Sequence, residues 1–325
     1  MQSINSIEKR IPKINDKNFK NYALDVFKYQ AKSNRVYKAY LTNLNVEIAG
    51  IKELDNVPFL PIEFYKSEIV KSDNWSEETV FYSSGTTGQQ KSEHFIKNLS
   101  FYHRNTKHIF ESFYGPLNNY MIVALLPSYE NNSSLVSMVS NFIDQSGCSE
   151  SSFISKDLSL LELKKERAVE LGKTLLLIGV SHALLGLAEM GIDLRAAIIM
   201  ETGGMKGERT EITRKALHKS LCDGFNSKEI HSEYGMSELM SQAYSLGEGE
   251  FKAPNCMKVM IRDSYDPFSY IKSGKTGGIN IIDLANIHTC SFLETKDLGR
   301  ETDNGFEVLG RFDNSEVRGC NLMVL

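Results

Sequence analysis

The middle of the chain alternates short apolar runs with amphipathic segments, and this alternation limits the folds that are open to it. Strand-like runs are followed by helix-like segments, in the order 121–126, 158–171, 174–179, 182–190, 196–200 and 209–222. Strands that alternate with helices at this spacing predict a sheet with helices on its faces. From about residue 258 the apolar runs shorten and turns become frequent, which predicts an antiparallel β region at the end of the chain.

The first 72 residues have a different pattern. Residues 19–27 carry apolar side chains at helical spacing, and Pro58 and Pro61 interrupt the pattern. We expect helices before these prolines and a connecting loop over residues 57–64. Two strands are then predicted at 79–82 and 92–96, on either side of a Gly-rich loop.

A helix is predicted to follow the second of these strands. Asn98 and Ser100 are both suitable caps for its first turn, and the pair Gly115-Pro116 marks its end. We therefore expect this helix to run to about Tyr114.

Composition excludes several classes of protein. The chain has 325 residues, 41% hydrophobic and 24% charged, with a formal net charge of -4. A basic excess that would favour nucleic acid is missing, so no nucleic-acid partner is expected. The first residues lack the basic and apolar regions of a signal peptide. The most apolar stretch, 174–192, is interrupted by Ser181, His182 and Glu189, so a buried strand and helix are expected there and no membrane span.

The cysteines indicate a reducing compartment. There are five of them, an odd number, at positions 148, 222, 256, 290 and 320, and none forms a C-x-x-C pair. This pattern argues against a disulfide framework and against a zinc site, and it favours reduced thiols in the cytoplasm.

The Gly-rich loop is the clearest candidate for a binding site. Six of its nine residues from Ser83 to Lys91 are Ser, Thr or Gly, in the order Ser83, Ser84, Gly85, Thr86, Thr87 and Gly88. Glycines let backbone N–H groups approach an anion, hydroxyls add donors, and Lys91 adds a positive charge. Gln90 stands where a Walker A loop requires glycine, and a strand follows, so the loop is predicted to be a flap between two strands. A flexible hairpin without ligand has the same composition.

This loop resembles the phosphate loop of adenylate-forming enzymes, the superfamily of acyl-CoA synthetases, luciferase and peptide-synthetase adenylation domains. Further segments resemble that superfamily's motifs in the same order: Thr202-Gly203-Gly204-Met205, Glu233-Tyr234-Gly235-Met236-Ser237-Glu238, Thr295-Lys296-Asp297-Leu298-Gly299-Arg300 and Leu309-Gly310-Arg311-Phe312-Asp313. Lys296 replaces the glycine of the Thr-Gly-Asp motif. The resemblance implies an α/β fold, that of the large N-terminal domain of these enzymes, with ATP and Mg²⁺ as cofactors.

The resemblance also implies roles for individual residues. Glu238 would bind Mg²⁺, a hard cation that prefers oxygen ligands, and Ser237 would contact the α-phosphate. Tyr234 would stack on adenine, and Asp297 and Arg311 would hydrogen-bond the ribose hydroxyls. The remaining residues of the expected ATP site are Gly203, Gly204, Gly235 and Met236.

Most members of the superfamily continue for about a hundred residues past the hinge motif, the size of a small domain. That lid carries a lysine that completes adenylation. This sequence stops at Leu325, so we expect a single adenylation-type domain without the lid: a helical segment (1–75), an α/β core with the nucleotide site (76–255) and a β-rich part (256–325). Lys91, Lys206, Lys296 or a partner chain would replace the lid lysine.

One branch of the superfamily ends in this way. The segments 125–129, 133–136, 200–207 and 236–244 look like the acyl-protein synthetases of the LuxE type, which work with the fatty-acid reductase of bacterial bioluminescence. In that family a cysteine near the C-terminus accepts the acyl group as a thioester, and Cys320 is in the matching place, where Arg318 would favour the thiolate. A buried cysteine in a final strand, 320–325, is the alternative.

The acyl site is the least specified part. The stretch that begins with Val180, Ser181 and His182 matches the region that forms the acyl pocket in related enzymes, although a core helix would have the same sequence. His94 and His182 could line the pocket, or they could be ordinary core or solvated histidines.

The predicted function is therefore that of a ligase of the fatty-acid–protein type. It activates a carboxylic acid as an acyl-adenylate and passes the acyl group to a cysteine, for an acyl reductase or another acyl-accepting protein. The alternatives are a lidless acyl- or aryl-CoA ligase and a non-catalytic nucleotide- or acyl-binding subunit.

Overall fold

The computed structural model describes residues 8–83, 90–126, 132–155, 157–203, 213–271 and 274–312. Its α-helices are α2 (Asp16–Ser33), α3 (Arg35–Asn43), α4 (Phe64–Ser67), α5 (Leu99–Tyr114), α6 (Ser134–Ser146), α7 (Leu158–Glu170), α8 (Ser181–Ala188) and α9 (Arg214–Phe225). Short 3-10 helices are η1 (Ile11–Lys13), η2 (Ile48–Gly50), η3 (Leu54–Asn56) and η4 (Leu117–Asn119). Within these residues no helix combines the length and the apolar character that a membrane span needs.

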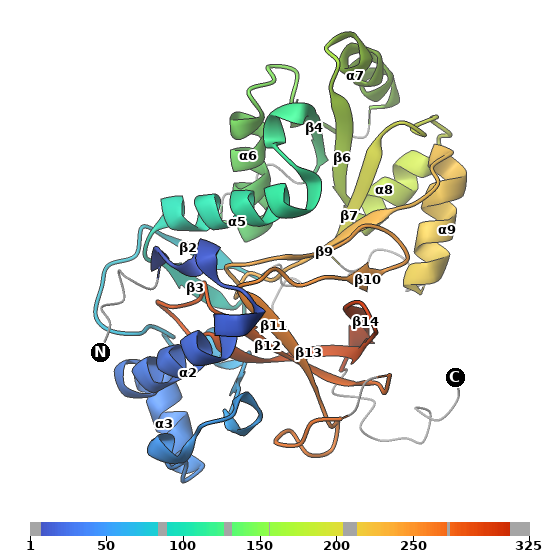
Figure 1. Cartoon of the computed structure of the whole chain (residues 1–325). Helices are drawn as coiled ribbons and strands as arrows, with labels where there is room; N and C mark the ends of the chain where they lie inside the picture. Colours follow the sequence, from blue (N-terminus) through green and yellow to red (C-terminus); the bar gives the residue numbers. More distant parts are fainter. Residues whose placement is uncertain are drawn as a thin grey trace.

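The strands belong to two sheets and one hairpin (Figure 1). The first sheet contains β4 (Tyr120–Leu125), β5 (Ser152–Phe153), β6 (Thr174–Val180), β7 (Ile198–Thr202), β8 (His231–Tyr234) and β9 (Ala243–Ser245). The second contains β1 (Leu60–Pro61), β10 (Glu250–Phe251), β11 (Met257–Arg262), β12 (Gly277–Asp283), β13 (Phe292–Glu301) and β14 (Phe306–Arg311). The hairpin pairs β2 (Thr79–Tyr82) with β3 (Glu93–Ile96) in antiparallel register.

The first sheet has the order β5-β4-β6-β7-β8-β9 and is parallel up to its last strand. Successive residues of β4 enter different cores: Ile122 and Ala124 pack on the side of α5 and α6, while Met121 and Val123 pack on the side of α7, α8 and α9. Because both faces are covered, the central strands are continuous apolar runs without a polar face. The predicted alternation of strands and helices is confirmed.

Several predicted boundaries hold and a few do not. Helix α5 begins after Asn98, whose side chain accepts the Phe101 N–H at 2.7 Å, and it ends at Gly115, where φ is +79°. Helix α6 and strand β8 have no counterpart among the predicted elements. The residues of β8, His231 to Tyr234, are mostly polar, so its strand pairing depends on the neighbouring chain segments.

The second sheet has the order β10-β14-β13-β12-β11, which confirms the predicted antiparallel β region, and β1 adds to it in parallel beside β13. The prediction that residues 57–64 form only a loop was wrong. Leu60 lies opposite Leu293 and is fully buried, so apolar burial draws this segment onto the sheet. Pro61 is tolerated because β1 is an edge strand, where a missing N–H breaks no central ladder.

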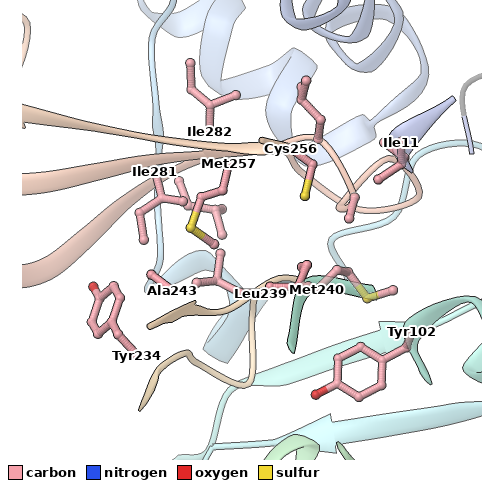
Figure 2. Packing of buried hydrophobic residues seen from close by; sticks show 14 of the residues in the cluster. Ile11, Tyr102, Tyr234, Leu239, Met240, Ala243, Cys256, Met257, Ile281 and Ile282 are labelled. Atoms are coloured by element: carbon pink, nitrogen blue, oxygen red, sulfur yellow. The ribbon is translucent and has the colours of Figure 1, made fainter. Parts of the chain in front are cut away.

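One hydrophobic core joins the two sheets. Figure 2 shows Leu239, Met240 and Ala243 facing Met257 and Ile281 of the second sheet. Leu239, Met240 and Ala243 follow β8, so the segment after this strand is packed against the second sheet. The cysteines that the structure describes, Cys148, Cys222, Cys256 and Cys290, are free thiols, as expected, and Cys320 lies outside the described residues.

Candidate functional site

Three strands of the first sheet end side by side at their carboxyl ends. Val180 ends β6 and Ser181 follows it, Gly203 follows β7, and Tyr234 ends β8. Gly203 has φ of +70°, and its carbonyl accepts a hydrogen bond from the Ser181 hydroxyl at 2.9 Å. In open α/β sheets ligands bind at this edge. The structure therefore brings together predicted site residues that are far apart in the sequence.

The hairpin β2–β3 carries the phosphate-loop candidate between its strands, as predicted. At the base of the loop, the Ser83 N–H donates to the Ser92 carbonyl at 3.2 Å, and the Ser92 N–H donates to the Ser83 hydroxyl at 2.9 Å. Lys91 is exposed beside this base. Ser84, Gly85, Thr86, Thr87 and Gly88 lie outside the described residues, as do Gly204, Lys206 and Cys320.

The turn after β8 is fastened to this hairpin. The Ser237 hydroxyl donates to the Tyr82 carbonyl of β2 at 3.0 Å, and the Ser237 carbonyl lies 2.7 Å from Nδ1 of His94 on β3. Glu238 comes next and is buried, with 6% of its surface exposed. Ser237 and Glu238, which are predicted to contact the α-phosphate and Mg²⁺, therefore lie beside the base of the predicted phosphate loop.

The predicted ribose residues meet the predicted adenine residue. Asp297 of β13 lies opposite Arg311 of β14, and the Arg311 Nε is 3.2 Å from the Asp297 Oδ1. The other oxygen, Oδ2, accepts the hydroxyl of Tyr234 at 2.8 Å. The ring of Tyr234 packs edge-on against Phe306 and at a tilt against Phe251.

A buried polar network lies next to the strand ends. Glu201 of β7 accepts the Ser181 hydroxyl at 3.1 Å, and its other oxygen lies 3.3 Å from the Arg214 Nε and 3.6 Å from the His218 Nε2. Burial would raise the pKa of Glu201, but the nearby His218 side chain and the charge of Arg214 outweigh it and hold the pKa below its usual value. Glu201 is therefore an ionised, paired carboxylate inside the fold.

The pKa of the nearby Glu233 is shifted in the opposite direction. Burial raises the pKa of Glu233 to about 7, the hydrogen bond from the Thr202 hydroxyl opposes that rise, and the negative charge of Glu201 adds to it. The same side chain explains Gly235, because a Cβ there would stand 2.5 Å from a Glu233 carboxyl oxygen. The two buried carboxyls thus have pKa values shifted in opposite directions.

The predicted acyl residues share the strand-end edge but differ in surroundings. Ser181 is buried and hydrogen-bonded to Glu201, while Val180 and His182 are half-buried. The rest of α8 packs into the core with α9. His94 is fully buried between two hydrogen-bond partners, so it is a core histidine.

The chemistry of the site suits ATP with Mg²⁺. In the described part of the chain, no cluster of three or more His, Cys, Asp and Glu side chains is arranged to hold a metal. Mg²⁺ commonly binds through one or two carboxylates together with substrate phosphates, so Glu238 beside a phosphate loop fits that habit. Glu238 and the phosphates would hold the ion, which would neutralise phosphate charge.

Comparison with known families decides the relationship. Residues 12–325 match the family described as acyl-protein synthetase, LuxE. The chain belongs to this family. Among curated proteins no similar sequence is found. The LuxE-family chain matches solved structures at low identity, so these show its fold alone.

Two kinds of ligase are among the similar structures. ATP-bound MatB from Rhodopseudomonas palustris aligns with a TM-score of 0.51 and 16% identity over 74% of this chain and 49% of that one. The 2-hydroxyisobutyryl-CoA ligase aligns with TM-scores of 0.65 and 0.66 in an open and a postadenylation state. The open state aligns at 12% identity over 92% of this chain and 70% of that one. The postadenylation state aligns at 11% identity over 97% of this chain and 72% of that one. The fold is that of the adenylate-forming ligases, and the chain spans about half the length of MatB.

Sequence motifs did not reveal the residues that hold the site in shape. Asp283 accepts hydrogen bonds from the N–H groups of Met240, Ser241 and Ala285, and Asn286 donates to the Glu238 carbonyl at 2.7 Å. Neither Asp283 nor Asn286 belongs to a motif. An acidic residue at the end of an apolar strand, Ile281-Ile282-Asp283, was the only available signal.

Proposed function

We propose that this LuxE-family protein uses ATP to activate a carboxylic acid as an acyl-adenylate and then transfers the acyl group to a protein cysteine. The observation that carries the proposal is the convergence of Tyr234, Asp297 and Arg311 from three different strands. The same fold fastens Ser237 to the hairpin of the phosphate loop. Family membership supports the same class of reaction.

The chemistry has two steps. A carboxylate oxygen attacks the α-phosphorus of ATP, an acyl-phosphate bond forms, and pyrophosphate leaves. A thiolate then attacks the carbonyl carbon of the acyl-adenylate, a thioester forms, and AMP leaves. ATP already contains the leaving group of the first step, pyrophosphate. The protein therefore contributes mainly by positioning the reactants and by stabilising the charge on the phosphates. Ser237 and Lys91 are the groups proposed to contact the phosphates, and Glu238 is proposed to bind the Mg²⁺ that the phosphates share.

The proposed substrate is an aliphatic acid, and the proposed acceptor is Cys320 of this chain. Support for the acid is the apolar stretch that starts at Val180, and support for the cysteine is the family resemblance. An acyl reductase or another acyl-accepting protein would take the acyl group next, inside the cytoplasm. A CoA ligase is the main alternative, since the 2-hydroxyisobutyryl ligase was solved with CoA.

Acid-dependent exchange of pyrophosphate into ATP tests the first step. We expect exchange with at least one member of a panel of aliphatic and aromatic acids. We expect Glu238→Ala to reduce it at least about a hundredfold, because the metal ion that this carboxylate would hold stabilises the charge that develops on the phosphates. Exchange that is independent of every acid would refute the activation step. Full activity in Glu238→Ala would refute the role of that carboxylate.

Labelling with radioactive acid tests the second step. We expect a hydroxylamine-sensitive label on the wild type that is lost in Cys320→Ser while exchange continues. Cys222→Ser is the matched control, because Cys222 is a free thiol and is partly exposed. Label that persists in Cys320→Ser, or acyl-CoA formed without labelled protein, would favour the alternative.

A further inference from the structure

The turn that carries Ser237 and Glu238 is held by side chains from distant parts of the chain. Asp283 of β12 accepts the Met240 and Ser241 N–H groups, each at 2.9 Å. Asn105 of α5 donates to the Met240 carbonyl at 2.8 Å. Asn286 donates to the Glu238 carbonyl. Such a turn has little regular pairing of its own, so its shape depends on these buried partners.

Ser237 is the point where this turn meets the hairpin. Its hydroxyl is bonded to β2 through the Tyr82 carbonyl, and its carbonyl is bonded to β3 through His94. His94 lies directly opposite Phe81 in the hairpin register. The two contacts of Ser237 therefore tie both strands of the hairpin to the residue that precedes Glu238.

The two hydrogen bonds of His94 determine which ring nitrogen carries the proton. A carbonyl only accepts, so the ring nitrogen facing the Ser237 carbonyl, Nδ1, must carry the hydrogen. The other nitrogen, Nε2, lies 3.0 Å from the hydroxyl of Thr289, which can donate to it. Burial lowers the pKa of His94 to about 4, and the bond to Ser237 opposes that effect. A neutral ring with one fixed tautomer satisfies both partners.

The ring has no freedom to turn. His94 is fully buried, and its ring meets the ring of Tyr65 at 5.5 Å between centroids and 84° between planes. A second rotamer would break both hydrogen bonds and leave a buried carbonyl without a donor, which costs free energy. His94 is thus a rigid link with a defined donor at one end and a defined acceptor at the other.

We propose that His94 is a positioning residue that fixes the hairpin strands β2 and β3 relative to the Mg²⁺-binding carboxylate Glu238. It acts through the Ser237 carbonyl and touches no ligand itself. Thr289 supports it by holding the tautomer that donates to Ser237. The inference rests on the proposed function, because it assumes that Glu238 and the loop act on the same ATP·Mg²⁺.

Calorimetric binding of ATP, with Mg²⁺ and with EDTA, tests the proposal on the full chain. His94→Phe keeps a ring and loses both hydrogen bonds, and we expect about a tenfold weaker binding of ATP with Mg²⁺ but a change under about twofold in EDTA. His94→Asn places an amide N–H near the position of Nδ1, and we expect it to recover most of the loss. His108→Asn, at an exposed histidine of α5, is the matched control.

Thr289→Val gives a second and milder test. We expect about threefold weaker binding with Mg²⁺, and no further loss when it is combined with His94→Phe, because Thr289 acts only through the ring. Thermal unfolding shows whether each variant is folded. If His94→Phe does not fold, His94→Asn and Thr289→Val still decide the question.

Three results would overturn the proposal. The first is folded His94→Phe whose ATP binding depends on Mg²⁺ as in the wild type. The second is an equal loss of ATP affinity in His94→Asn and His94→Phe. The third is a double variant, Thr289→Val with His94→Phe, whose loss of affinity is the full sum of the two single losses. Failure of the proposed function has a different signature: the wild type would bind ATP with Mg²⁺ but show no exchange with any acid. Wild type that binds no ATP would overturn both.

Discussion

Two arginine–carboxylate pairs, one between β7 and α9 and one between β13 and β14, differ in burial and therefore in their expected roles. Arg214 and Glu201 sit at the end of the parallel sheet, with 27% and 2% of their side chains exposed. Arg311 and Asp297 pair across two strands of the antiparallel sheet, with 58% and 10% exposed. A pair cut off from water is coupled to folding, whereas a half-open pair has room for a ligand. The predicted ribose residues Asp297 and Arg311 form a pair of the second kind.

The largest expected effect is on stability, from breaking the buried pair. Glu201→Ala leaves Arg214 and His218 without their carboxylate, and we expect a loss of about 3 kcal/mol in the free energy of unfolding. Urea denaturation measures it. Asp193→Ala is the control, because Asp193 pairs with Arg195 at the surface and should cost less than about 1 kcal/mol. Equal effects of the two substitutions would remove the contrast between buried and open pairs.

The next effect is a pH dependence of stability at the buried network. The folded pKa of Glu233, about 7, is above its ordinary value of 4.5, so its contribution is present at low pH and is lost as pH rises through 7. We expect Glu233→Gln to remove about 2 kcal/mol of that decline between pH 5 and pH 8. Urea denaturation at both pH values measures this change in stability. Asp283 is present in both proteins, so its contribution is the same in both curves. Parallel curves for the two proteins would show that folding does not raise the pKa of Glu233.

The smallest effect is expected at the open pair, and it concerns ligand binding. Asp297→Asn keeps the shape but loses the charge, and we expect about tenfold weaker ATP binding with less than about 1 kcal/mol change in stability. Calorimetry and urea denaturation measure the two quantities. Tyr234→Phe removes only the hydroxyl that Asp297 accepts and serves as the matched variant. A large loss of stability in Asp297→Asn would place this pair with the buried one.

Two motif residues lie at strand ends in the fold. Gly203 follows β7 and Tyr234 ends β8, and the parallel edge brings them together because each strand ends at the same side of the sheet. The flap between β2 and β3 was likewise predicted, because a strand pattern resumes directly after Lys91. Strand β1 was missed, since two residues that contain a proline have no periodic pattern.

Other contacts could not have been predicted from spacing. The bond between Tyr234 and Asp297 joins residues 63 positions apart, and it depends on the register of β13 against β14 and on how the two sheets pack. His94 was open to three interpretations, because a histidine next to a loop has the same sequence whether it faces ligand, solvent or core. Its two hydrogen bonds, to Ser237 and Thr289, exist only in the folded chain.

By itself the sequence determined the alternation of strands and helices, the antiparallel end region and the motif residues of the candidate ATP site. Local propensity and apolar periodicity carry that information within a few neighbouring residues. Tertiary structure alone decided which buried carboxyls have lowered and which have raised pKa values, and which is paired with an exposed arginine. These properties depend on desolvation and on partners such as Arg214 and Arg311, and both arise only when distant segments pack together.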